Sequence, residues 1–278
     1  MIWKYAPGCR LMYKEDFIMI RVTIWNENVQ ERWDELSADL PEKEREGRTA
    51  NALAVRKVHP KGIHNTLAGI FEGCEDISVR IATLDMPEHG LTDEVLNETD
   101  VLLWWGHVAH DQVSEEVAEK VHQRVLQGMG FIPLHSAHLC KPMRKLLGTS
   151  CTLQWRDGDF CRVWNVMPGH PIAQGVDPMF ELHPEEMYGE FFDIPQPDEL
   201  VFVSWFRGGE VFRSGCAWKR GYGKMFYFGP GHETNTAYHN ENVRRIILNA
   251  VRWAAPSRIV APLSCPHAEV SPEAKYQK

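Results

Sequence analysis

The sequence lacks the features that mark several large classes of protein. No apolar run approaches the ~20 residues that a transmembrane helix needs, which argues against a membrane protein. The net charge is −8 and no basic block occurs, so a nucleic-acid-binding surface is not expected. The seven cysteines are scattered, odd in number and never spaced as C-x-x-C, which is typical of reduced thiols in a cytoplasmic protein.

Histidine and tryptophan are abundant instead, with 13 and 10 residues in a chain of 278. Histidines cluster at candidate loops, and indole rings supply flat surfaces on which sugars stack. The hydrophobic share of 44% and the charged share of 24% are those of an ordinary globular protein. The length suits one large α/β domain or two small ones.

The chain divides into three predicted parts. Residues 1–18 contain no periodic segment, and Lys14-Glu15-Asp16 can be encoded by a purine-rich ribosome-binding sequence a suitable distance before Met19. We therefore predict that residues 1–18 are a spurious or disordered extension and that translation begins at Met19. Residues 19–255 are expected to form a single α/β domain, and residues 256–278 a loosely held tail.

Strand and helix patterns alternate through the first half of the chain. Val101–Trp105 is apolar throughout, as in a central parallel strand buried on both faces. Thr92 and Ser114 are the predicted N-caps of two helices. The order predicts a doubly wound parallel sheet, with strands over Ile20–Trp25, Ile77–Leu84, Val101–Trp105 and Gly130–Leu134.

The second half is predicted to extend the same sheet with antiparallel strands. Pro- and Gly-rich turns separate several short strand patterns there. The predicted strands are Arg162–Val166, Glu199–Trp205, Glu210–Phe212 and Lys224–Phe228. Apolar side chains at core spacing predict a final helix over Asn242–Ala254.

Ionisable side chains gather where three of the predicted strands end. The strand Gly130–Leu134 runs directly into a predicted helix that continues to about Leu147. Ligands of open α/β sheets bind at the carboxyl ends of the strands, so the side chains that follow these strands are candidates for one site. They are His107 with His110, His135 with Ser136 and His138, and His232 with Glu233.

A divalent metal, most plausibly zinc, is the first interpretation of this site. Neutral histidine is the common zinc ligand, and catalytic zinc keeps one position open beside three protein ligands. The i, i+3 spacing of His135 and His138 would place both on one helical face. The candidate ligands are His107, His110, His135, His138 and His232. The alternative is that these histidines hydrogen-bond to backbone and acids in a polar pocket.

Two interpretations need no metal. In one, Ser136 is a nucleophile and His232 its base, oriented by Glu186 or Glu233. Its flanking residues do not form G-x-S-x-G, so the sequence gives no support for a tight elbow. In the other, His135 and Glu233 act as general base and acid in the enolisation or epimerisation of a sugar ketone.

Candidate substrate-binding residues lie at strand ends and in the second half. Asn26 and Glu27 end the first strand at the ligand edge. Trp104 and Trp105 point to opposite faces, so only one can line the site, and we select Trp105. Glu186 and Tyr188 are predicted to hydrogen-bond to sugar hydroxyls. The alternative for Glu185–Tyr188 is a solvated acidic turn.

A resemblance to a known family rests on five stretches, which are Val22–Glu27, His59–His64, Trp104–His107, Leu134–His138 and Gly229–Glu233. Through them the chain resembles the class I glutamine amidotransferase-like fold and, within it, the ThuA-like trehalose-utilisation family, over about Met19 to Ala255. The resemblance implies a flavodoxin-like core. It also implies a role in carbohydrate catabolism alongside sugar dehydrogenases, which makes oxidised sugars reasonable substrates.

The chain departs from the amidotransferases at their catalytic elbow. Those enzymes place a cysteine there between glycines, activated by a histidine next to a glutamate. Here His135 or Ser136 occupies the elbow, and the nearest thiol, Cys140, lies further along the chain. A thiolate is the nucleophile that this chemistry needs, so glutamine hydrolysis is not expected.

The sequence therefore predicts a carbohydrate-utilisation enzyme that hydrolyses, isomerises or epimerises a glucoside or its keto derivative. The alternative is a non-catalytic sugar-binding or partner protein that kept the fold and lost the cysteine. The expected partner is a small-molecule sugar. The apolar strands of the second half are also compatible with a homo-oligomer.

Overall fold

The computed structural model describes residues 19–262 and 264–276 of the chain. The predicted extension, residues 1–18, lies outside the described residues. Seven helices and nine strands are found in the described part, together with short 3-10 turns. The helices are α1 (Trp33–Leu36), α2 (Glu42–Val58), α3 (Ile63–Ala68), α4 (Asp93–Asn97), α5 (Glu115–Gln127), α6 (Lys141–Leu147) and α7 (Glu241–Ala254).

All nine strands form one sheet, in the order β2-β1-β3-β4-β9-β8-β7-β5-β6. The first five strands of this order are parallel, and the last four continue the sheet in antiparallel pairs. The predicted antiparallel extension is therefore confirmed. The strands are β1 (Ile20–Asn26), β2 (Ile77–Thr83), β3 (Val101–Trp105), β4 (Gly130–Leu134), β5 (Gln154–Asn165), β6 (Met179–Gly189), β7 (Glu199–Phe206), β8 (Val211–Arg220) and β9 (Gly223–Phe228).

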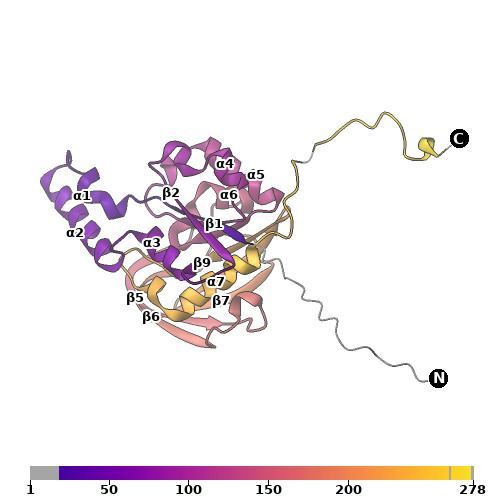
Figure 1. Cartoon of the computed structure of the whole chain (residues 1–278). Coiled ribbons are helices and arrows are strands. Elements are labelled where there is room, and N and C mark those ends of the chain that lie inside the picture. Colours follow the sequence, from indigo (N-terminus) through magenta and orange to yellow (C-terminus); the bar gives the residue numbers. More distant parts are fainter. Residues whose placement is uncertain (1–18, 263, 277–278) are drawn as a thin grey trace, which may run out of the picture.

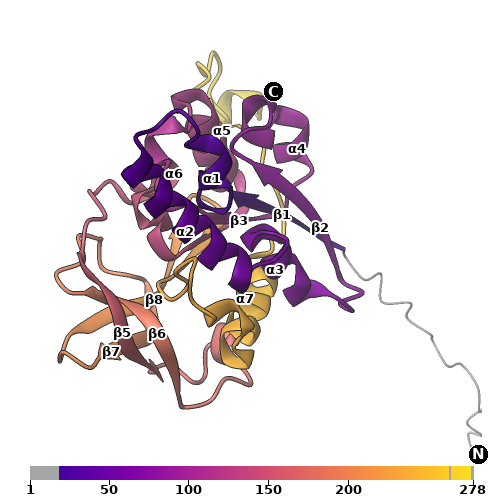
Figure 2. The same cartoon turned by 90° about the vertical axis from the view of Figure 1, so that its left-hand side faces the viewer.

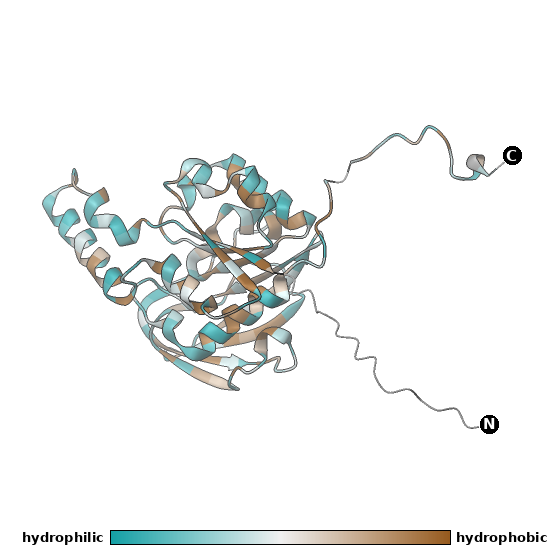
Figure 3. Cartoon of the chain, viewed as in Figure 1, coloured by the Kyte–Doolittle hydropathy of each residue, from teal (hydrophilic) through white to brown (hydrophobic). Residues whose placement is uncertain are grey.

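Helices cover both faces of the parallel half, as in a flavodoxin-like fold. α3 and α7 pack on one face, and α4, α5 and α6 lie on the other (Figures 1 and 2). The strands between them are the apolar part of the molecule (Figure 3), and every residue of β3 and β4 is buried. Burial on both faces explains why these strands carry continuous apolar runs.

The predicted N-caps are present. Thr92 Oγ1 accepts a hydrogen bond from the Val95 amide at 3.3 Å, and Ser114 Oγ accepts one from the Val117 amide at 3.2 Å. Each satisfies an amide that the first turn of a helix leaves without an intrahelical partner. The charge-dense segment that follows β1 forms α1 and α2, which project from the body in Figure 1.

Three predictions about the elements need correction. The helix expected to run unbroken from β4 to about Leu147 is a 3-10 turn, His135–Leu139, followed by an extended Cys140 and then α6. β5 and β8 are longer than predicted. β6 was not predicted at all, because Pro184 and four acidic or histidine side chains interrupt its apolar pattern.

Residues 256–262 and 264–276, which follow α7, run outward from the body in Figure 1 and are mostly exposed. They meet the body near the end of α5, where the Val260 amide donates to the Gln127 carbonyl at 2.9 Å. Within residues 264–276, a short 3-10 turn forms over Glu273–Lys275. Within the described residues, no helix is both long and apolar enough to cross a membrane.

Candidate active site

The carboxyl ends of the parallel strands bring the predicted histidine clusters together. His107 follows β3, His135 follows β4 and His232 follows β9. Their ring centroids lie 5.4 to 5.6 Å apart, and each ring stands edge-on to the other two. One histidine from each of the three predicted clusters therefore lies next to a histidine from each of the other two.

Glu233 anchors the imidazole of His107. Its Oε2 atom lies 2.9 Å from His107 Nδ1, and its Oε1 atom accepts hydrogen bonds from the side-chain amides of Gln30 at 2.6 Å and Asn51 at 3.4 Å. Burial would raise the pKa of Glu233, but its hydrogen bond to His107 and the nearness of the His107 and His232 rings lower it to about 2. The carboxylate therefore stays ionised and holds His107 Nδ1–H toward itself.

His135 occupies the elbow after β4. Its φ of +53° lies in the left-handed region, which a residue with a Cβ rarely adopts, so the backbone does turn sharply here without a G-x-S-x-G sequence. Nδ1 donates to the carbonyl oxygen of Gly229 at 2.9 Å, which aims Nε2 at Glu186 Oε2, 3.1 Å away. The ring is only 1% exposed, and His135 does not line the cavity described below.

His135 Nε2 and Glu186 Oε2 lie 3.1 Å apart, and each side chain shifts the pKa of the other. Burial alone would lower the pKa of His135, but the hydrogen bond and the charge of Glu186 outweigh burial and raise it. Burial likewise would raise the pKa of Glu186, but His135 lowers it. The pair therefore favours an imidazolium beside a carboxylate.

Ser136 is joined to Tyr188, and Tyr188 in turn to His135. The two hydroxyl oxygens lie 2.6 Å apart, and the Tyr188 hydroxyl lies 3.2 Å from His135 Nε2. Burial raises the pKa of Tyr188, so its phenol stays protonated. The base predicted for Ser136 was His232, but the hydrogen bond of the Ser136 hydroxyl goes to Tyr188. The geometry thus gives no support for Ser136 as an activated nucleophile.

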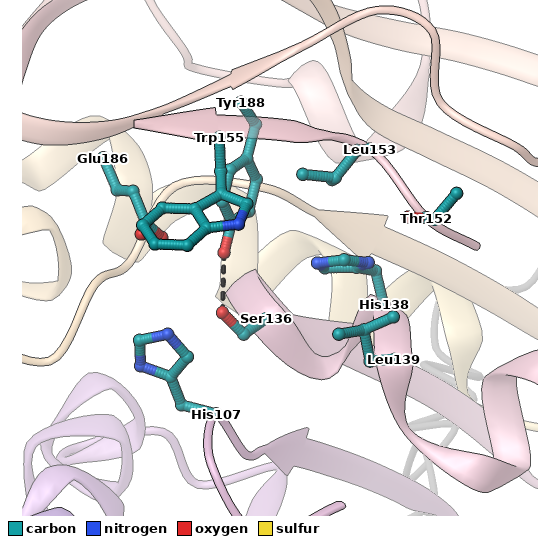
Figure 4. Close-up of a pocket in the computed structure, with 9 residues that line it drawn as sticks. All are labelled: His107, Ser136, His138, Leu139, Thr152, Leu153, Trp155, Glu186 and Tyr188. Carbon is teal, nitrogen blue, oxygen red and sulfur yellow. Dashed lines mark hydrogen bonds between the residues drawn. The ribbon is translucent and has the colours of Figure 1, made fainter. Parts of the chain in front are cut away.

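A cavity of about 270 Å³ opens beside these groups (Figure 4). His107 and Glu186 line one end, and His138 lies at the other, with Ser136 between them. The indole of Trp155, on β5, stands over the cavity with 63% of the residue exposed. The full lining is His107, Ser136, His138, Leu139, Thr152, Leu153, Trp155, Glu186 and Tyr188.

Three side chains offer a compact set of metal donors. Within residues 19–262 and 264–276, ligand atoms of His107, Glu186 and His232 lie within 4.8 Å of one another. Burial lowers the pKa of His232, which keeps its ring neutral and able to donate a lone pair. Two imidazoles and one carboxylate are the donor types that zinc takes in catalytic sites. The residues present therefore fit a divalent metal.

His110 and His138, also predicted as metal ligands, lie outside that donor set. Burial lowers the pKa of His110 to about 4 and that of His138 to about 3, so both rings are neutral. His138 Nδ1 is bonded to the carbonyl oxygen of Cys151 at 2.6 Å. His135, the remaining predicted ligand, also lies outside the donor set, and its Nδ1 atom is bonded to the carbonyl oxygen of Gly229.

Three predicted substrate-binding residues are structural instead. Asn26 is fully buried and donates to Glu31 Oε1 at 2.7 Å. Glu27 accepts from the amides of Val108 at 2.9 Å and Ala109 at 3.0 Å, and so shapes the loop that carries His107. Burial raises the pKa of Glu27.

Trp105 is the third of these residues. It is fully buried and donates its indole N–H to the Gly231 carbonyl at 3.2 Å. Its ring also packs edge-on against His107, with 6.3 Å between the ring centroids. Trp105 therefore supports His107 from behind and presents no face to a ligand.

Glu186 and Tyr188 line the cavity as the substrate-binding prediction requires. The alternative of a solvated acidic turn is wrong, because Glu185 and Glu186 are 1% and 5% exposed within β6. Burial raises the pKa of Glu185, which accepts from the His232 amide at 3.3 Å.

Sequence reasoning missed several residues of the site. Gln30 and Asn51 reach Glu233 from about 200 residues away along the chain, and no local pattern marks them. Leu139, Thr152 and Leu153 have ordinary sequence surroundings. Trp155 was not selected as a substrate-binding residue either, although its polar neighbours in Gln154–Asp157 are a signal that could set it apart from the core indoles.

The fold and the site together define an α/β protein of the flavodoxin-like type, with a polar crevice at the carboxyl ends of its parallel strands. The family described as ThuA, trehalose utilisation, matches residues 21–254. The chain belongs to this family. Trehalose utilisation is the description of the family as a whole.

Solved structures agree with this assignment at the level of the fold. A ThuA-like protein from Parabacteroides merdae is 12% identical, with a TM-score of 0.59 over 88% of this chain and 92% of its own. One from Bacteroides uniformis is 14% identical, with a TM-score of 0.55 over 89% and 95%. A cytoplasmic protein from Salmonella typhimurium is 12% identical, with a TM-score of 0.50 over 69% and 87%. No protein of curated function matches the chain.

Proposed function

We propose that this protein is an enzyme of carbohydrate utilisation that transfers protons on a keto-sugar, and so isomerises or epimerises it. The observation that carries the proposal is the convergence of two histidine–glutamate pairs, His107–Glu233 and His135–Glu186, at one end of a cavity with an exposed indole. Two ionisable pairs with different environments are the arrangement that separates an acid from a base.

His107 is the proposed general base. Because Glu233 holds Nδ1–H, the lone pair of a neutral His107 ring is on Nε2, as in other carboxylate-oriented histidines. His107 lines the cavity and is partly exposed, so a ligand can reach this nitrogen. In the proposed step, Nε2 takes the proton from the carbon next to the ketone.

The Glu186–His135 pair is the proposed acid. The electron pair of the broken C–H bond moves to the ketone oxygen, which takes up a proton from the Glu186–His135 pair. The enediol can then regain a proton at either carbon or on the opposite face, which gives the isomer or the epimer. Trp155 supplies the stacking surface for the sugar ring.

Hydrogen exchange tests the proposed step without assuming the final product. In D2O, the protein should introduce deuterium next to the ketone of an oxidised glucoside, as followed by NMR. His107→Ala should slow this exchange by about 10²- to 10⁴-fold, the usual contribution of a general base. His122→Ala, on the outer side of α5, is the matched control and should exchange at the wild-type rate.

The outcome also separates this proposal from the non-catalytic alternative. Binding of the sugar without any exchange, in wild-type protein, would support a sugar-binding protein that does no chemistry. Equal exchange in wild-type protein and His107→Ala would instead show that another group is the base.

A bound divalent metal is the second candidate, because His107, Glu186 and His232 form a donor set of the right chemistry. Such an ion would supply Lewis-acid polarisation of a sugar oxygen, which would also suit hydrolysis. Glu233 would orient His107, as carboxylates commonly orient metal-bound histidines.

Elemental analysis of purified, untagged protein tests the metal. Near-stoichiometric zinc, manganese or nickel is expected, with loss in both His107→Ala and His232→Ala. His138→Ala lies outside the donor set and should keep its metal. Protein that carries no metal after purification without chelators would remove this candidate and leave the acid–base proposal in place.

A further inference from the structure

We propose that His138 is a specificity-determining residue whose Nε2 atom accepts a hydrogen bond from a hydroxyl group of the ligand. This inference deepens the proposed function, on which it rests for the ligand being a sugar. It assigns His138 neither to the metal donors nor to the acid–base pairs. Its basis is the hydrogen-bonding state that the surroundings impose on the ring.

The hydrogen-bond partner of Nδ1 fixes the tautomer of the His138 ring. His138 Nδ1 lies 2.6 Å from the carbonyl oxygen of Cys151, and a carbonyl oxygen only accepts hydrogen bonds. Nδ1 must therefore carry a proton and donate it. In a neutral ring this leaves Nε2 as an acceptor with a free lone pair.

The surroundings of His138 also keep its ring neutral. His138 is 5% exposed and is enclosed by aromatic rings, with those of Tyr188, Phe192 and Tyr227 edge-on at 5.5, 5.9 and 6.4 Å. Burial is the main reason why its pKa falls to about 3, and the neighbouring His135 and His110 lower it further. Near neutral pH the ring carries no charge.

The position of His138 places its ring within reach of a ligand. His138 lines the cavity at the end away from His107, beyond Ser136 (Figure 4). The ring nitrogen remote from its backbone, Nε2, points into the space below Trp155 in that view. A lone pair held there attracts an O–H donor and repels an anion. This end of the cavity therefore selects a neutral hydroxyl and rejects a phosphate or carboxylate at the same place.

Nitrogen NMR of the ligand-free protein tests the state of His138. Signals lost in His138→Phe assign the ring in ¹⁵N-labelled protein. At pH 7 we expect a protonated Nδ1 and an unprotonated Nε2. A proton on Nε2, alone or together with one on Nδ1, would overturn the inference, whatever the protein binds.

Binding of an oxidised glucoside that carries the ketone, and of its monodeoxy analogues, tests the ligand contact. Wild-type protein should lose about tenfold in affinity for one deoxy analogue, the order expected for one hydrogen bond to a buried acceptor. His138→Phe should bind the oxidised glucoside and that analogue equally. His138→Gln, which offers an amide oxygen, should recover part of the discrimination.

His122→Phe is the control, since that histidine lies on α5 away from the cavity lining. It should discriminate as wild-type protein does. Discrimination that survives unchanged in His138→Phe would overturn the inference. Failure of wild-type protein to bind any of these sugars would count against the proposed function, and the nitrogen spectra would still decide the state of His138.

Discussion

Tryptophan residues show how burial decides the role of a side chain. Trp25 and Trp104 stack with ring centroids 3.8 Å apart in the core, and Trp105 is fully buried behind His107. Trp155 lies on β5 with its ring over the cavity and is 63% exposed. An indole that water can reach beside polar side chains can stack on a sugar, whereas the buried indoles stabilise the sheet.

We predict that Trp155→Ala weakens sugar binding about fivefold, because the loss of one stacked ring costs about 1 kcal/mol. The free energy of unfolding should change by less than about 0.5 kcal/mol, since the residue is mostly exposed. Isothermal titration and thermal unfolding measure the two effects. Trp164→Ala, on the same strand and 46% exposed, should leave binding unchanged. Equal weakening in both variants would contradict a specific role for Trp155.

The sequence was informative about residue types at the site and uninformative about their pairing. His107, His135 and His232 could be predicted to converge because each follows a strand that ends at the same edge. Their partners could not be predicted, because His107 and Glu233 are 126 residues apart and no local pattern links them. The same holds for His135 and Glu186, which come from the two different halves of the sheet.

At the scale of elements, helices and strands could be predicted where several local sequence signals agreed with one another. β3 is a short apolar run, and α5 begins at a serine cap with acidic residues in its first turn, so both could be predicted. β6 could not be predicted, because Pro184, Glu185 and Glu186 interrupt its apolar pattern. The acidic pattern that reads as a turn is, in three dimensions, the part of the strand that supplies Glu186. Functional positions break the pattern that a strand would otherwise show.

The N-cap of α7 gives a prediction at this scale. Asn240 Oδ1 accepts from the amides of Asn242 at 2.9 Å and Val243 at 3.3 Å. Asn240→Ala should lower the free energy of unfolding by about 1 kcal/mol, the usual effect of losing an N-cap. Chemical denaturation measures it. Asn97→Ala, at the exposed last position of α4, should have little effect, and an equal loss in both would argue against a capping role.

At the scale of the whole molecule, buried neutral histidines link stability to pH. Burial is the main reason why the pKa of His59 falls from 6.5 to about 4. The unfolded chain therefore binds a proton at this residue that the folded chain does not. The stability that this difference contributes is fully present above pH 6.5 and is lost as the pH falls toward 4.

We predict that His59→Gln reduces the fall in melting temperature between pH 7 and pH 4, even though it lowers stability at pH 7. Glutamine does not titrate, so the variant lacks the proton uptake of the unfolded chain. Differential scanning fluorimetry over this range measures the difference. The partly exposed His122, replaced by Gln, should follow the wild-type curve. Parallel curves for wild-type protein and His59→Gln would contradict the prediction.

The parallel pairing of β4 with β9 has a consequence for folding during synthesis on the ribosome. Phe131 of β4 pairs with Met225 of β9, so the two central strands are separated by most of the antiparallel half. The first half of the chain can begin to fold as it emerges, but β9 and α7 must be released before the sheet is complete. His107 and Ser136 are made early, and Glu186 and His232 late. A nascent chain therefore acquires a competent pocket only after β9 and α7 have left the ribosome.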